Sequence, residues 1–193
     1  MTRKTISIIL VVGVILLLVL LSVSGYNELV MKDETCKKQW SAVESRYKQR
    51  ADLALKYVNK VKDYASHEQE TLTRATRAVN QALQVKISPN NITQTSINEL
   101  QIVQNNLSLA LQQLNTVSER HSELKTNNDL LVLQSQLKDM ENQIAVERQC
   151  YADVTGDFNV SISRFPANVI ANLFGFERKT VFDVEKGIEN ISK

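Results

Sequence analysis

Glycine and proline are scarce in this sequence. Its 193 residues include only five Gly and two Pro. An all-β fold needs a turn every eight to twelve residues or so, and Gly and Pro are the residues that most turns use. The shortage therefore argues against an all-β fold and favours long helices, and the length fits one domain of ordinary size.

Cysteine and histidine are equally sparse, with two of each. Cys36 and Cys150 are far apart in sequence and belong to no Cys/His cluster, so neither a zinc site nor a disulfide framework is predicted. His67-Glu68 resembles the start of a zinc-binding HExxH motif, but Thr71 stands where the second His is required. We therefore interpret His67 as a surface residue. We predict no catalytic residues, no cofactor or metal, and no small-molecule substrate.

Charge of one sign is not in excess. The formal net charge is +2, and Arg3 and Lys4 account for it, so the rest of the chain has 21 basic and 21 acidic residues. Nucleic-acid-binding proteins generally show a basic patch that contacts several phosphates. Here charges of both signs alternate along the chain, which excludes nucleic acid as an expected partner.

The first feature that is present is an apolar run at residues 6–23, ISIILVVGVILLLVLLSV, which contains no charge. Eighteen helical residues extend about 27 Å, close to the ~30 Å hydrocarbon core of a bilayer. We predict a transmembrane anchor at residues 6–25, preceded by a short tail at residues 1–5. The alternative is a cleaved signal peptide, because small residues follow at Ser22 and Ser24, but the run exceeds the usual apolar length of such peptides.

Three later segments carry apolar residues at three-four spacing, which predicts long amphipathic helices. Their expected bounds are about 28–85, 96–119 and 127–164. Pro89 and its polar neighbours end the first segment, and a polar stretch near Asn127 precedes the third. Such helices pack antiparallel with coiled-coil-like crossing. The predicted fold class is therefore all-α: an N-terminal transmembrane helix, then an antiparallel bundle of three long helices and a short C-terminal helix.

The short C-terminal helix is expected at residues 166–174, with Pro166 at its first position and Gly175 at its end. Residues 177–193 then form a C-terminal tail. This segment has two interpretations: a fourth helix that covers the bundle, or a docking patch for a protein partner or a membrane surface. The candidate interaction patch consists of Phe165, Ile170, Leu173, Phe174, Phe176 and Phe182.

Two charged residues interrupt the apolar seams. Glu68 falls on the seam of the first long helix, and Arg148 falls on that of the third. A buried charge needs a partner. We hypothesise that Glu68 and Arg148 pair across the bundle and fix its register; the alternative is that the seam drifts and Glu68 reaches water.

Several motifs resemble a known family. They include Tyr26-Asn27-Glu28-Leu29-Val30, Trp40, Arg50-Ala51-Asp52-Leu53, Gln134, Asn159, Phe165-Pro166 and Phe174-Gly175-Phe176. Together they resemble the LemA family of bacterial membrane proteins over nearly the whole chain. One departure is Leu55, where the family usually has Pro. The resemblance implies a single-pass transmembrane helix, a helical bundle, and a topology with the N-terminus outside and the body in the cytoplasm. It implies no reaction.

These features favour a membrane-anchored, non-enzymatic interaction or scaffold protein of the bacterial cell membrane. Its expected partners are the lipid bilayer, through residues 6–23, and an unknown protein or a second copy of the chain. The alternative is an envelope enzyme or transport accessory whose carboxylate site is dispersed along the sequence.

Overall fold

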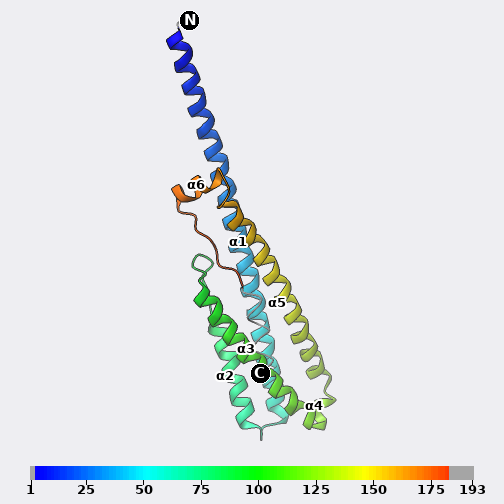
Figure 1. Ribbon diagram of the computed structural model, residues 1–193. Helices are drawn as coiled ribbons and strands as arrows, with labels where there is room; N and C mark the ends of the chain where they lie inside the picture. Colours follow the sequence, from blue (N-terminus) through cyan, green and yellow to red (C-terminus); the bar gives the residue numbers. More distant parts are fainter. Residues whose placement is uncertain (1–2, 183–193) are drawn as a thin grey trace. The chain divides into compact units, whose positions relative to one another are not determined.

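The computed structural model describes residues 3–182, which form six helices and no strand. Between residues 3 and 21, the side chains described are those of Leu10, Val12, Leu16 and Leu20. The helices, coloured along the chain in Figure 1, are α1 (Arg3–Tyr64), α2 (Gln69–Gln84), α3 (Gln94–Arg120), α4 (Ser122–Lys125), α5 (Asn128–Ser161) and α6 (Ala167–Phe174). The all-helical fold class is confirmed. The tail from residue 183 onward lies outside the described residues.

The helices contribute to two compact units. The first unit combines the residues up to Lys37 with Asp153–Lys179, and the second combines Lys38–Ala152 with the residues from Thr180. Both α1 and α5 contribute to each unit, so the two units are built from shared helices.

The second unit packs α2–α4, the later part of α1 and most of α5 around two apolar clusters. One cluster gathers small residues of α1 and α2 against Leu107 and Leu114 of α3. The other surrounds Trp40, which is fully buried and whose indole Nε1 donates a 3.0 Å hydrogen bond to the Ile87 carbonyl. Helices α2 and α3 pack against each other as a hairpin.

The first long helix differs from the sequence prediction, which placed one helix over residues 28–85. The structure breaks it at residues 65–68, and α2 begins at Gln69. The Ala65 and Glu68 amides donate to carbonyls of the preceding turn, and Ala65 is buried while Ser66 and His67 are exposed. This turn lets α2 fold back so that Leu72 and Val79 join the cluster that contains Val61.

Side-chain caps define the start of two other helices. Thr93 accepts a 3.1 Å hydrogen bond from the Ser96 amide, and the Ser96 hydroxyl accepts one from the Thr93 amide, which makes a capping box for α3. Asn127 accepts from the Leu130 amide at the start of α5. These caps satisfy amides that have no partner inside the helix.

The first unit packs α6 and the end of α5 against α1. Leu29, Phe158, Ile162 and Ile170 form its apolar core. The close approach of α6 to α1 depends on Gly25, because a Cβ there would lie 2.5 Å from Cδ1 of Ile170.

Helix α6 ends at Gly175, whose φ of 74° is the left-handed conformation that favours glycine at a helix end. Pro166 stands just before the helix, as its N-cap, rather than at the first helical position. Apart from this shift, α6 occupies the stretch expected from the sequence.

Among the described residues, no helix has both the length and the apolar content needed to cross a membrane. Most side chains between residues 6 and 23 lie outside the described part, so the predicted anchor stays a prediction from the sequence.

Candidate functional site

Helix α3 presents an uncharged face to solvent, here called the α3 face. Its exposed residues are Ile102, Asn105, Asn106, Leu109, Gln112, Gln113 and Thr116. At about 100° per residue they occupy roughly one third of the helix circumference. The two apolar members are one heptad apart, with Ile102 61% exposed and Leu109 58% exposed. Amides and two aliphatic side chains therefore form one continuous surface.

The α3 face lies in a long stretch with almost no charge. Between Lys86 and Glu119, the only charged residue is Glu99. Burying an ionised group against another protein costs much more than burying an amide that finds a hydrogen-bond partner. Charged residues are accordingly depleted from the cores of protein interfaces. The composition of the α3 face is therefore suited to burial against another protein.

The opposite side of α3 is held by a buried arginine of α1. Arg50 is 4% exposed, and one terminal nitrogen of its guanidinium donates to Gln104 Oε1 at 2.8 Å. The other donates to Ser108 Oγ at 2.8 Å and pairs with Glu141 Oε1 at 2.7 Å. This fork joins α1, α3 and α5 at one level of the second unit, which fixes the register of α3.

A second polar cross-link lies further along the same helices. The Tyr57 hydroxyl donates to Asn115 Oδ1 at 2.8 Å, and the Gln134 amide donates to the Tyr57 oxygen at 2.9 Å and to Asn115 at 2.6 Å. Tyr57 itself is 1% exposed. Two polar layers, each built on a buried residue of α1, thus position α3 against its neighbours.

The predicted pair of Glu68 and Arg148 is not brought together. Glu68 lies in the turn between α1 and α2, whereas Arg148 stacks on the Phe182 ring, 4.6 Å from its centroid, and hydrogen-bonds Tyr47. Tyr47 precedes the end of α1 at Tyr64 by seventeen residues, about 26 Å along a helix. The ion pairs that join α1 to α5 include Arg50 with Glu141, in which the arginine is buried and the carboxylate is exposed.

Phe182 belongs to a buried aromatic cluster and not to a docking patch. It is 3% exposed, stacks on Trp40 at 5.6 Å and meets Tyr151 edge-on at 5.8 Å. The Tyr151 hydroxyl donates to the Thr180 carbonyl at 3.0 Å, which holds this part of the chain in place. The Phe182 side chain therefore contributes to the core of the second unit.

The other members of the predicted patch all lie in the first unit, but they differ in exposure. Ile170 is buried at 7% exposed and Phe176 is half-buried. Phe165, Leu173 and Phe174 are exposed by 83%, 77% and 55% respectively. One side of α6 therefore covers the core of the first unit, and the other side faces outward.

A cavity of about 260 Å³ lies beside Trp40 in the second unit. Its wall mixes apolar residues with charged ones, including Glu44, Lys48 and Lys86. Among the described residues, no group of three or more His, Cys, Asp or Glu side chains is placed to hold a metal ion.

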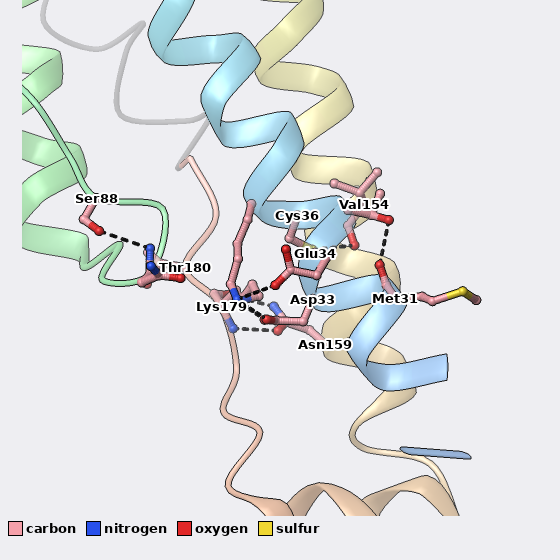
Figure 2. A network of polar contacts seen from close by, with 12 residues as sticks. Met31, Asp33, Glu34, Cys36, Ser88, Val154, Asn159, Lys179 and Thr180 are labelled. Atoms are coloured by element: carbon pink, nitrogen blue, oxygen red, sulfur yellow. Dashed lines mark hydrogen bonds and ion pairs between the residues drawn. The ribbon is translucent and has the colours of Figure 1, made fainter. Parts of the chain in front are cut away.

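In the first unit, a polar network fixes the chain that follows α6. Figure 2 shows Asp33 and Asn159 gathered around Lys179. The Lys179 ammonium pairs with the Asp33 carboxylate and lies 5.1 Å from the centre of the Phe158 ring. The Asn159 side chain both accepts from the Lys179 amide and donates to its carbonyl, each at 2.8 Å. The extended segment after Gly175 is thereby tied to α1 and α5.

The pKa values of Asp33 and Cys36 in this network are shifted. Burial raises the pKa of the Asp33 carboxyl, but hydrogen bonds from Lys179 and Lys37, together with their charges, outweigh it, so its pKa lies below the ordinary value. Burial raises the pKa of the Cys36 thiol, which also donates a weak 3.4 Å hydrogen bond to the Val154 carbonyl. Cys36 is a buried free thiol, whereas the free thiol of Cys150 is exposed.

The α3 face was not predicted from the sequence, although a signal for it exists. Asn, Gln and aliphatic side chains form no catalytic or metal-binding pattern, so the residue types alone do not indicate a site. The long interval between charged residues is visible in the sequence, and its placement on an exposed helix face requires the fold.

Comparison with protein families matches residues 39–192 to the LemA family. Comparison with curated proteins gives no match.

Proposed function

The chain belongs to the LemA family, and from this premise we propose that it is a membrane-anchored, non-enzymatic interaction protein of the cell membrane. The apolar run at residues 6–23 serves as the membrane anchor, because it has the length and composition of a bilayer-spanning helix. The helical bundle then presents a binding surface at the membrane.

The observation that carries the binding role is the α3 face. From Ile102 to Thr116 its exposed amides and aliphatic side chains include no charged residue, and the exposed Glu99 and Arg120 lie about one turn beyond its two ends. Arg50 and Tyr57 hold the helix from behind. A rigid, uncharged helix face loses little solvation and little conformational entropy on binding. The expected partner is a helix of another protein or of a second copy of this chain.

Photo-crosslinking in intact cells tests this role. A benzophenone amino acid at Asn105, in the middle of the α3 face, should give one defined adduct, whereas the same probe at exposed Lys138 on α5 should not. Ile102→Glu with Leu109→Glu should abolish the adduct, because a charge would be buried in the interface. The matched control is Val132→Glu with Val146→Glu, which changes two exposed valines of α5. An adduct that survives the α3 double substitution would refute binding through this face.

The body is proposed to lie in the cytoplasm with the N-terminus outside. Lys125→Cys, made in a chain that also carries Cys150→Ser, places a single exposed thiol at the end of α4. A membrane-impermeant thiol reagent should leave it unlabelled in intact cells and label it after lysis. Labelling in intact cells would show that the body lies outside the cytoplasm and would refute the proposed topology.

A further inference from the structure

We propose that α6 is an interfacial helix, which lies in the headgroup layer of the same membrane that the anchor crosses. Its outward apolar residues would then enter the outer part of the acyl chains. This inference rests on the proposed anchor at residues 6–23. It assigns a second membrane contact to residues 165–176.

The position of α6 along α1 is the first observation. Ile170 touches Gly25, and the Phe174 ring lies 4.7 Å from the Tyr26 ring. These contact points follow the end of the apolar run at Val23 by two and three residues, or about 3–5 Å along the helix. The interfacial layer on each side of the hydrocarbon core is about 5–7 Å thick. The contacts therefore place α6 at the depth of the headgroups.

The direction of α6 agrees with this depth. Figure 1 shows α6 running across α1 rather than alongside it. If α1 crosses the bilayer, α6 is therefore oriented along the membrane surface, as interfacial helices are.

The composition of α6 is the second observation. Residues 165–176, FPANVIANLFGF, carry no charge, while Arg164 precedes them and Glu177-Arg178 follow them. Ile170 and Ala171 face the core of the first unit. Phe165, Val169 and Leu173 recur at every fourth residue and are 83%, 57% and 77% exposed. The helix thus has one apolar side against the protein and an uncharged outward side, on which these large apolar residues are joined by the exposed Asn172.

A lipid surface fits this outward side better than a protein does. An exposed patch of large apolar residues needs a cover, and the bilayer is already present within a few ångströms if the anchor spans it. Tyr26 adds an aromatic ring at the same level, and tyrosine is enriched at membrane interfaces. The exposed Arg164 and Arg178 side chains can reach the phosphates of lipid headgroups.

Fluorescence quenching in vesicles tests the inference on the full chain. Cys150→Ser removes the exposed thiol, and Cys36, at 1% exposed, stays unlabelled. An NBD fluorophore is attached to Leu173→Cys, and in separate proteins to Leu16→Cys within the anchor and to Leu109→Cys on α3. All three leucines are exposed helix residues, at 77%, 62% and 58%. The vesicles are phosphatidylcholine and phosphatidylglycerol with a nitroxide either near the headgroup or deep in the acyl chain.

The expected result is quenching at position 173 that is stronger with the shallow nitroxide than with the deep one. Position 16 should respond more to the deep nitroxide, and position 109 to neither. Quenching at 16 without quenching at 173 would overturn the interfacial helix and leave the anchor standing. Absence of quenching at 16 would overturn the anchor and the proposed function with it.

A second measurement separates lipid from a second protein copy. If α6 were covered by another molecule of this chain, NBD emission at 173 would fall as the protein is diluted at constant lipid concentration. The interfacial helix predicts emission independent of that dilution. Dilution-dependent emission would assign the patch to self-association and overturn the proposal.

Discussion

At the scale of single residues, Arg50 makes the most specific contacts of the second unit. Its guanidinium donates to Gln104 and Ser108 of α3 and pairs with Glu141 of α5. Lysine carries the same charge but has no planar fork, so it cannot make these three contacts together. The arrangement therefore depends on the shape of the side chain as well as on its charge.

We predict that Arg50→Lys lowers the free energy of unfolding by about 1–3 kcal/mol, because at least one hydrogen bond to a buried charged group is lost. Urea unfolding of the full chain in detergent, followed by circular dichroism, measures the change. The control is Arg77→Lys at an exposed position of α2, which should have little effect. Equal stability of the two variants would refute the role of the fork.

Asp33 gives the first unit an acid-sensitive contact. Its folded pKa lies below the ordinary value because the hydrogen bonds from Lys179 and Lys37 outweigh the effect of burial. A lowered pKa contributes stability above the unfolded pKa of about 3.9, and this contribution is lost as the pH falls through the folded pKa. The paired carboxylate therefore stabilises the folded chain at neutral pH and stops doing so in acid.

We predict that Asp33→Asn reduces the loss of thermal stability between neutral pH and about pH 3. At neutral pH the same variant should be less stable than the natural chain, because Lys179 and Lys37 lose their anionic partner. Melting temperatures across this pH range measure both effects, with the exposed Asp52→Asn as control. A variant as acid-sensitive as the natural chain would contradict the assignment.

The site residues were harder to predict than the apolar core, for a reason that Arg50 illustrates. Periodicity identifies which residues face inward on one helix, but the partner of a buried charge depends on the register between helices. Glu68 and Arg148 were chosen because each interrupts an apolar seam, and the fold places them apart. Arg50 was visible only as part of a family motif.

At the scale of elements, three-four spacing was sufficient to predict α3 and α5 close to their observed bounds, and Pro166 and Gly175 were sufficient to predict α6. The spacing was wrong about the first long helix. Val61, Ala65 and Leu72 keep the seam spacing across the break at residues 65–68, and the break contains neither Gly nor Pro. Both α1 and α2 bury that seam in one cluster, so the pattern is the same for a straight helix and for a hairpin.

The break gives a prediction at this scale. Two glycines inserted between the exposed Ser66 and His67 should lower stability by less than about 1 kcal/mol, because they only lengthen a turn. The same insertion between Val58 and Asn59, inside α1, should disrupt the seam and unfold the bundle. Circular dichroism and urea unfolding of the two proteins make the comparison. Equal damage from both insertions would favour one continuous helix.

At the scale of the whole molecule, we propose a membrane anchor followed by a helical body with two exposed uncharged surfaces, the α3 face and the outward side of α6. The α3 face suits a protein partner, because it combines amides with aliphatic side chains on a rigid helix. The outward side of α6 suits lipid, because it is uncharged, carries large apolar side chains and lies within about 5 Å of the end of the apolar run. We therefore propose different partners for the two surfaces.

Retention of residues 1–24 decides whether the chain is anchored at all, since a cleaved signal peptide would remove residues 6–23. The most direct measurement is the intact mass of the protein recovered from membranes after an alkaline wash. We predict that the protein stays in the membrane fraction with its full mass of 21.8 kDa. Release by the wash, or a mass that lacks the residues before Gly25, would contradict it.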